Sequence, residues 1–489
     1  MAASSLENPN PSPPKLGLLP LVALIFFDVS GGPFGVEPSV SAGGGPLLAL
    51  AGFLLFPLLW SLPEALLTAE LSSAFPSNGG YVLWISSAFP TLPALTLATG
   101  FLKWTSGTID NALYPILFLD YFPFLPRAPF AFLTTAVLTF LNYRGLHIVG
   151  LSAVLLTAFS LSPFVVMSLL SVPKLRPARW LEMRVENVNL SNYFNCMFWN
   201  LNYWDKASTL AGEVEDPGRT FPKAVFGAVV LVVGSYLVPL LAGTGATEAG
   251  SDGQWTDGFF AEVGAGIGGA WLGWWIRAAA AVSNVGLFEA EMSSDSFQLL
   301  GMSEMGMIPE IFSRRSKYGT PTISILCSAT GVIILSWMSF QEILEILNFL
   351  YALGMLIEFA AFIKLRIRKP DLRRPYKVPV GTFGAVVLCL PPTFLLILVM
   401  CLASVRTLAI SVVVIILGSL LYPAMQYMKE KKWVRFIDTP LPAESFTEVL
   451  PTDCTEEVDE AYASLLPDPS SIQEGQHSEI GLEEVSKVE

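Results

Sequence analysis

The sequence predicts an all-α integral membrane protein built around two related groups of five membrane-spanning helices. Composition is the first reason, because 53% of the 489 residues are apolar and only 14% are charged. A soluble domain cannot hide that much apolar surface. The second reason is that apolar runs of about 20 residues, enough to cross roughly 30 Å of hydrocarbon, recur twelve times. The third is that the first and the sixth run are both interrupted by polar residues.

Each apolar run predicts one membrane-spanning helix. The twelve predicted spans are residues about 17–40, 46–71, 92–120, 128–143, 148–171, 192–212, 221–242, 270–300, 320–339, 341–365, 381–403 and 405–428. They divide the chain into a disordered N-terminal arm (1–15), a core (16–365), a basic loop with helices 11 and 12 (366–428) and an acidic disordered tail (429–489). Within the core, residues 16–171 form the first group of five spans and residues 192–365 form the second.

The net charge of −13 comes from the end of the chain. Residues 438–489 contain fourteen Asp and Glu residues and one basic residue, Lys487, whereas the preceding residues carry 27 charges of each sign. A polar, acidic segment without an apolar stripe is typical of disorder. The tail therefore says nothing about the chemistry of the membrane core.

The distribution of basic loops predicts the orientation, because Lys and Arg near span ends mark the cytosolic side. The segments "SRRSK", "KLRIRKPDLRRPYK" and "KEKKWVR" follow spans 8, 10 and 12, and alternating spans place all three on one side. The loop after span 5, which contains Lys174, Arg176, Arg179 and Arg184, opposes this assignment. We expect both termini in the cytosol and the plasma membrane as the location, with an endomembrane such as the Golgi or the ER as the alternative.

Two spans contain residues that should break a helix. Span 1 includes "FFDVSGGPFGVEP" (26–38), and span 6 reads "NYFNCMFWNLNYWDKASTLAGEV" (192–214). Unpaired backbone groups in lipid cost several kcal/mol each, so an unwound segment persists only where protein or a cavity satisfies it. Breaks in the first and sixth of ten spans predict a five-plus-five inverted repeat with a central site, and spans 11 and 12 lie outside this repeat.

Three segments carry a resemblance to a known family. "SGGPFG" in span 1, "FWNLNYWDKASTLAGEVEDPGRTFPKA" around span 6 and "GMIPEIFSRRSKYGTP" after span 8 resemble motifs of the amino acid–polyamine–organocation superfamily. Together they are similar to the plant polyamine uptake transporters, a branch close to the L-type amino acid transporters, over residues 16–428. The resemblance implies a LeuT-type fold and proton-driven uptake of polyamines (spermidine, spermine and putrescine) and of cationic mimics such as paraquat.

Carboxylates inside the spans are the candidates for binding a polyamine, since ionisable residues within a membrane are functional by default. The resemblance places Asp205 where bacterial exchangers of the superfamily carry a glutamate, and Trp199 at their substrate-stacking tryptophan. The alternatives for Asp205 are an ion pair with Lys206 and a helix cap. In span 8, Asn284, Phe288, Glu291 and Asp295 share one helical face, and Glu291 is the candidate for substrate or proton, against an interhelical hydrogen-bond patch.

Further candidates lie on three other segments. In span 3, Lys103, Gly107, Asp110 and Tyr114 share a face, so Asp110 is expected either to contact a second ammonium group or to pair with Lys103. Tyr351 is the expected aromatic contact in span 10, and Glu358 is expected to pair with the basic residues 364–368. The breaks add Ser30, Gly31, Gly32 and Asn202 to the expected substrate-binding residues.

The proton-coupling candidates are Asp28, Asp205 and Glu291. Asp28 has three open interpretations, namely substrate contact, cap of the broken segment and proton carrier. Sodium-independent members of the superfamily often have a span 5 lysine, but the resemblance aligns Ser160 with it, so proton and sodium coupling both stay open. A neutral amino acid transporter of the same fold and a transporter-like nutrient sensor are the alternative functions.

An enzyme is not expected, because the sequence has no HExxH, nucleophile-elbow or intramembrane paired-aspartate motif. No cofactor, metal ion or nucleic-acid partner is expected. The L-type animal relatives join a partner through an external cysteine near spans 3 and 4, where this chain reads "LDYFPFLPRAPF" without a cysteine. We therefore expect no disulfide-linked partner, and expect the substrate, protons and membrane lipid as the partners.

Overall fold

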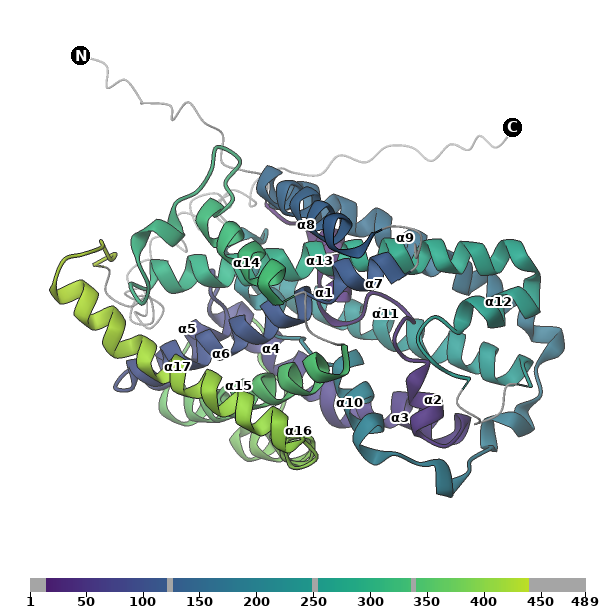
Figure 1. The fold of residues 1–489 in the computed structure, drawn as a ribbon. Coiled ribbons are helices and arrows are strands. Elements are labelled where there is room, and N and C mark those ends of the chain that lie inside the picture. The colour runs from purple at the N-terminus through teal and green to yellow at the C-terminus, as the bar shows by residue number, and fades with distance from the viewer. Residues whose placement is uncertain (1–14, 121–125, 249–253, 336–339, 439–489) are drawn as a thin grey trace, which may run out of the picture. The chain divides into compact units, whose positions relative to one another are not determined.

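The computed structural model describes residues 15–120, 126–248, 254–335 and 340–438. Helices form all the regular secondary structure of this part (Figure 1), and β-pairing is limited to isolated bridges such as Leu16 with Val214. A helix or a pair of helices lies in each of the twelve predicted spans. Six helices of the described residues are long and apolar enough to cross a membrane: Pro46–Ala74, Leu146–Lys174, Pro217–Ala246, Leu344–Arg368, Thr382–Cys401 and Val405–Glu430.

The first half of the core runs from α1 to α9. Its elements are α1 (Leu18–Val29), α2 (Pro38–Ala42), α3 (Pro46–Phe56), η1 (Pro57–Ser61), α4 (Leu62–Ala74), α5 (Tyr81–Ala88), α6 (Pro93–Asn111), α7 (Tyr114–Asp120), α8 (Arg127–Arg144) and α9 (Leu146–Ser171). Three short 3₁₀ turns follow, η2 (Val172–Lys174), η3 (Pro177–Leu181) and η4 (Val185–Asn187).

The second half of the core runs from α10 to α15. Its elements are α10 (Leu190–Asn200), η5 (Lys206–Glu213), α11 (Pro217–Ala246), α12 (Phe260–Gly268), α13 (Ala270–Glu304), η6 (Glu310–Ser313), α14 (Thr322–Leu335) and α15 (Phe340–Arg368). Helices α16 (Thr382–Cys401) and α17 (Val405–Glu430) follow this core.

The two halves repeat the same order of elements. Each begins with a broken helix, continues with one long helix, and places a short helix, α5 or α12, before the third span. The packing repeats as well, since α5 packs on α6 and α15, and α12 packs on the corresponding helices α13 and α9. Figure 1 shows α5 and α12 at opposite ends of the helices. Neither short helix is predicted from the sequence, because each is too short to appear as an apolar run of membrane-spanning length.

Span 1 is broken where the sequence predicts it. Helix α1 ends at Val29, and the amides of Ser30 and Gly31 both donate to the carbonyl of Phe26, at 2.8 and 3.1 Å. Gly31 and Gly32 have φ values of +67° and +115°, a region that glycine enters without a steric penalty. The chain stays non-helical until Pro38 begins α2. The predicted polar break is therefore a backbone conformation that this glycine pair permits.

Span 6 is also broken, by a different device. Helix α10 ends at Asn200, and the tyrosine at position 203 has a φ of +69° before η5 begins at Lys206. A positive φ is uncommon for a residue with a side chain and marks a locally strained turn. Span 3 is interrupted as well, between α6 and α7, although the sequence analysis treats it as continuous.

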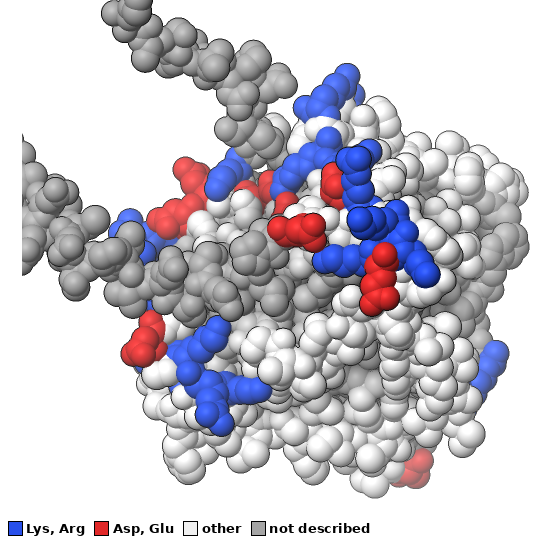
Figure 2. Space-filling view, turned by 90° about the vertical axis from the view of Figure 1, so that its left-hand side faces the viewer, with Lys and Arg blue, Asp and Glu red and all other residues white. Residues whose placement is uncertain are grey.

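The basic loops gather at one end of the helices. The backbone amide of Glu310 donates to the carbonyl of Arg435 at 2.8 Å, so the loop after α13 contacts the segment after α17. Arg366 and Arg374 of the basic segment at the end of α15 and after it both pair with the buried carboxylate of Glu70 near the end of α4. Figure 2 shows Lys and Arg side chains gathered on this face, with acidic side chains among them.

The loop that opposes the orientation lies at the other end, where acidic residues meet it. Arg179 pairs with Glu248 at 2.9 Å, and Arg176 lies 3.8 Å from the same carboxylate. These basic side chains are therefore partly neutralised by the loop after α11.

A close contact between α13 and the turn before α5 depends on a glycine pair. A methyl group on Gly301 would collide with the backbone of Gly79 and would lie 2.5 Å from the carbonyl carbon of Asn78. We predict that Gly301→Ala destabilises the fold by about 1–3 kcal/mol, because backbone cannot move aside as a flexible side chain can. Thermal unfolding of the purified protein in detergent checks this through a lower melting temperature.

The matched control is Gly234→Ala in α11, where a methyl group would meet nothing within 4 Å. This change should preserve or raise the melting temperature, since alanine is the better helix former by up to about 1 kcal/mol. A melting temperature of the Gly301→Ala variant at or above that of the wild type would contradict the close packing of Gly301 against the backbone of Gly79.

Candidate functional site

The first cluster of charges surrounds Lys103 of α6. Its ammonium group forms ion pairs with the carboxylates of Asp205, which follows the break in span 6, and of Glu358 in α15. All three side chains are fully buried. The cluster therefore joins the first half of the core to the second through charge, in a place from which water is excluded. An ammonium group in such surroundings is stable only when carboxylates compensate for its lost hydration.

Tyr351 of α15 connects this cluster to a third carboxyl group. Its hydroxyl contacts both Asp205 and Glu64 of α4, the latter at 2.7 Å. A phenol has a single proton and can donate only one strong hydrogen bond. If both contacts are hydrogen bonds, one of the two carboxyl groups must itself carry a proton. The geometry is therefore that of a tyrosine hydroxyl between two carboxyl groups.

Aromatic rings line the same cluster. The Lys103 ammonium lies 4.0 Å from the ring centroid of Tyr81 and 4.4 Å from that of Tyr351. Cations within about 6 Å of a ring face are attracted by its quadrupole. The Lys103 position thus offers the two features that bind an ammonium group, namely carboxylates and aromatic faces.

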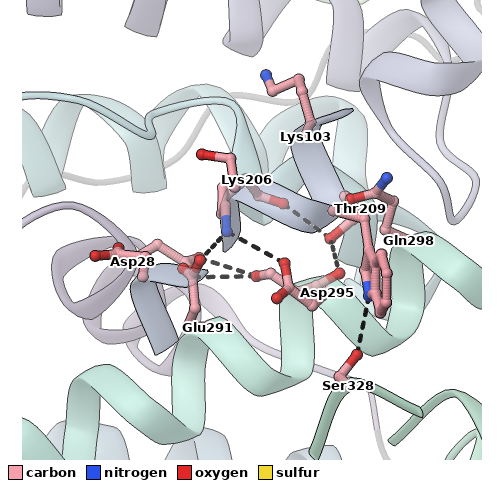
Figure 3. Close-up of polar contacts among 12 residues, drawn as sticks. Asp28, Lys103, Lys206, Thr209, Glu291, Asp295, Gln298 and Ser328 are labelled. Carbon is pink, nitrogen blue, oxygen red and sulfur yellow. Dashed lines mark hydrogen bonds and ion pairs between the residues drawn. The ribbon is translucent and has the colours of Figure 1, made fainter. Parts of the chain in front are cut away.

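The second cluster surrounds Lys206, the first residue of η5. Its ammonium group pairs with Glu291 and, at 3.2 Å, with Asp295, both from α13. Figure 3 shows these three side chains pointing toward one another. Asp28 at the end of α1 accepts a hydrogen bond from Ser294, at 3.1 and 3.2 Å for its two oxygens.

Glycine makes room for this second cluster. A methyl group on Gly107 of α6 would collide with the Lys206 ammonium and with Asp295, and would lie 2.8 Å from a Glu291 oxygen. The predicted inward face of span 3 therefore does lie against the span 8 acids.

Asp110 ties α6 to both broken segments. Its carboxylate accepts hydrogen bonds from Trp199 of α10 at 3.1 Å and from Tyr114 at 2.8 Å. The Trp199 ring covers Gly35 so closely that a methyl group there would lie 2.5 Å from a ring carbon. Asp110, Trp199 and Tyr114 thus form one hydrogen-bonded group beside the breaks.

Two tyrosine rings lie between the clusters. The centroids of Tyr203 and Tyr351 are 4.4 Å apart, with Tyr351 beside Lys103 and Tyr203 at 5.1 Å from the Lys206 ammonium. The order in space is therefore an acid-held ammonium group, an aromatic pair and a second acid-held ammonium group. Methylene groups pack well on aromatic surfaces of this kind.

Negative charge is in excess at this site. Within the described part of the chain, seven buried carboxyl groups meet two lysine ammonium groups; the acids are Asp28, Glu64, Asp110, Asp205, Glu291, Asp295 and Glu358. Four of these acids each have one oxygen without a hydrogen-bond partner among the described residues. The nitrogen and the oxygen of the Asn202 side-chain amide also have no partner there. A buried site with surplus acceptors favours cations or protons.

The structure brings most of the predicted site residues together. Asp205, Glu291, Trp199, Asp110, Tyr351, Tyr114 and Asp28 all belong to the contacts above. At the span 1 break, the hydroxyl of Ser30 accepts from the amide of Gly32 at 3.0 Å, and the Gly31 carbonyl accepts from Ser283. Phe288 is fully buried in α13.

One expected pairing is wrong, and two pairings that were left open as alternatives differ from those in the structure. Glu358 pairs with Lys103 and not with residues 364–368, because its position in α15 faces α6. Asp205 pairs with Lys103 and not with its neighbour Lys206, which reaches α13 instead. Asp110 bonds to Trp199 and Tyr114 rather than to Lys103.

Glu64 was missed, although a signal was available. It lies in the second span, in "LPEALLTAEL", and an acid inside a span is a candidate by the same argument that selects Asp205. Tyr81 and Tyr203 carried no such signal, since an aromatic residue in a span is ordinarily a packing residue.

The chain is similar in sequence to proteins of a known family. A family model described as amino acid permease matches residues 16–428. A probable polyamine transporter of Arabidopsis thaliana is 66% identical over 470 residues, which cover 94% of this chain and 97% of the relative. The polyamine transporter PUT1 of Oryza sativa subsp. japonica is 55% identical over 441 residues, covering 88% and 82% of the two chains. The polyamine transporter RMV1 of Arabidopsis thaliana is 54% identical over 432 residues, covering 86% and 87%.

The buried pair between Lys103 and Asp205 makes a stability prediction. Lys103→Met leaves the buried carboxylates of Asp205 and Glu358 without their cation and should be strongly destabilising. In the double variant with Asp205→Asn one of these two charges is gone, so its loss should be smaller than the sum of the two single losses by about 1–3 kcal/mol. Unfolding of the four proteins by dodecyl sulfate in mixed micelles measures this coupling.

The control cycle uses the pair of Arg179 and Glu248, whose carboxylate is exposed to solvent. Water and salt screen that pair, so its coupling should stay below about 1 kcal/mol. Equal coupling in the two cycles would contradict a charge pair in a water-excluded site.

Proposed function

Because this chain belongs to the amino acid permease family, we propose that it is a secondary transporter that imports polyamines such as spermidine, spermine and putrescine. The observation that carries the proposal is the arrangement of two acid clusters on either side of a tyrosine pair. A polyamine is a chain of methylene groups with two to four ammonium groups. Carboxylates would hold two ammonium groups, and the rings of Tyr203 and Tyr351 would contact the methylene groups between them. The names of the similar plant proteins support the same substrate class.

The proposed architecture is a LeuT-type fold of twelve spans. Residues 16–171 and 192–365 form the two inverted repeats, and residues 366–428 add a basic loop and two further helices. The repeated order of elements and the reciprocal packing of α5 and α12 support this arrangement. Alternating access would then move the bundle that contains the broken segments against the other helices.

The excess of carboxyl groups distinguishes a polyamine from an amino acid as the substrate. An amino acid brings a carboxylate, which requires backbone N–H groups or cations, whereas this site offers surplus acceptors. The substrate-binding residues in the proposal are Asp205, Glu291, Asp110, Trp199, Asn202, Tyr351 and Tyr114, with Ser30, Gly31, Gly32 and Phe288 around them. Paraquat, a dication without N–H groups, would rely on the aromatic faces and the charge alone.

Protons are the proposed coupling ion. The Tyr351 hydroxyl between Asp205 and Glu64 supports this, because the two contacts together call for a proton on one carboxyl group. Asp28 and Glu291 are further candidates, since both are buried and lie near Lys206. Proton entry from an acidic exterior and release inside would drive uptake of the cationic substrate. We propose the plasma membrane as the location, with both termini in the cytosol.

Uptake of radiolabelled spermidine into vesicles reconstituted with the purified protein tests the function. We expect saturable uptake that increases several-fold when the outside is more acidic than the inside. Uptake of radiolabelled leucine under the same gradient should be at background, because the ammonium groups of Lys103 and Lys206 are already paired with carboxylates of the protein.

Three other outcomes would contradict parts of this proposal. Leucine uptake without spermidine uptake would favour a neutral amino acid transporter. Specific spermidine binding without flux would favour a sensor. Uptake that depends on a sodium gradient and not on the pH gradient would show that sodium, and not the proton, is the coupling ion.

Glu291→Gln tests the pocket directly. It removes one of the two carboxylates beside Lys206 while keeping the size of the side chain, so we expect the half-saturating spermidine concentration to rise at least tenfold, or about 1.4 kcal/mol. The matched control is Glu430→Gln at the exposed end of α17, which should leave uptake unchanged. Wild-type affinity in Glu291→Gln would remove this residue from the substrate site.

A further inference from the structure

We propose that Lys103 and Lys206 are tethered substitutes for the ammonium groups of the substrate, which occupy the acid clusters in the empty transporter and are displaced when a polyamine binds. This inference rests on the proposed function. It adds a role for two cations that a cation-binding site would otherwise be expected to exclude.

Each lysine already makes the contacts that a substrate ammonium group needs. Lys103 meets two carboxylates and two tyrosine rings, and its ammonium also lies 3.5 Å from the Met355 sulfur. Lys206 meets two carboxylates and the ring of Tyr203. A polyamine cannot use these acceptors fully while both lysines hold them.

The lysines also affect the empty transporter. After releasing its substrate, a carrier must return through the membrane with its site vacant, and each unpaired buried carboxylate costs several kcal/mol. An ammonium group on a flexible four-carbon stem can fill the place of the departed cation without leaving the protein. The lysines would therefore lower the energy of the empty state during its return.

A displaced Lys206 can pair with other carboxylates near its present position. Asp28 and Asp110 are close enough to interact with the charge of Lys206, and neither forms an ion pair with it here. Asp110 is held by neutral donors, Trp199 and Tyr114, and Asp28 by the hydroxyl of Ser294. When a substrate ammonium takes Glu291 and Asp295, Lys206 can turn toward these acids and stay paired.

The test separates net uptake from exchange. Net uptake of labelled spermidine into empty vesicles requires the return of the empty carrier, whereas exchange against unlabelled spermidine inside the vesicles does not. We expect Lys206→Met to lower net uptake at least tenfold and to keep exchange within threefold of wild type. Spermidine should bind this variant at least fivefold more tightly in detergent, because no lysine competes for the carboxylates.

Lys206→Arg keeps the positive charge and should weaken the binding of spermidine, whereas Lys206→Met should strengthen it. The planar guanidinium of the arginine can bind carboxylates with two hydrogen bonds and is harder to displace, so net uptake should persist while the half-saturating concentration rises at least threefold. Lys223→Met, an exposed lysine of α11, is the matched control and should leave both assays unchanged. If Lys206→Met does not fold, the arginine variant in the same assays still decides the question.

The outcomes are distinguishable. Parallel loss of net uptake and exchange in folded Lys206→Met, or weaker spermidine binding, would give the lysine a structural or positioning role and overturn this inference alone. Unchanged net uptake would overturn it as well. A wild-type protein that carries no polyamine in either assay would overturn the proposed function, and this inference with it.

Discussion

A charge buried in a membrane must be compensated by another group of the protein, and the ion pairs around Lys103 and Lys206 meet this requirement. Each ammonium group satisfies two carboxylates that come from a different part of the chain. The backbone then has to bring those parts together at one depth. The breaks at Gly31 and Tyr203, and the missing side chain at Gly107, serve that requirement, since unbroken helices with larger residues would not admit the clusters.

The same pairs connect elements that a transporter has to move. Asp205 and Lys206 belong to the broken segment of span 6, whereas Lys103 and Glu358 belong to α6 and α15, and Glu291 belongs to α13. A movement of the broken segment would separate each lysine from at least one of its partners. Buried pairs have discrete arrangements rather than a continuum, so such a movement would pass between distinct states. Opening of the site and exchange of cation partners would therefore be one event.

Much of this arrangement could be predicted from the sequence. The Gly-Gly-Pro run and the polar centre of span 6 predicted both breaks, and the rule that intramembrane acids are functional selected Asp205 and Glu291. The partners of these acids could not be predicted in this way. Helical spacing shows which residues share a face of their own helix, but it does not give the rotation of that helix against its neighbours. Glu358 illustrates this, because sequence proximity favoured residues 364–368 while packing of α15 on α6 gave it Lys103.

Charge also limits which loaded states are reasonable. The cluster around Lys103 has three carboxyl groups, those of Asp205, Glu358 and Glu64, so one ammonium group leaves two negative charges. The Tyr351 contacts call for a proton on Glu64 or Asp205, which leaves one. When a substrate ammonium replaces Lys103 in the cluster, this proton leaves one negative charge there instead of two, and the smaller net charge costs less to carry across the membrane. Electrostatics at this cluster therefore favours moving the proton and the amine in the same direction.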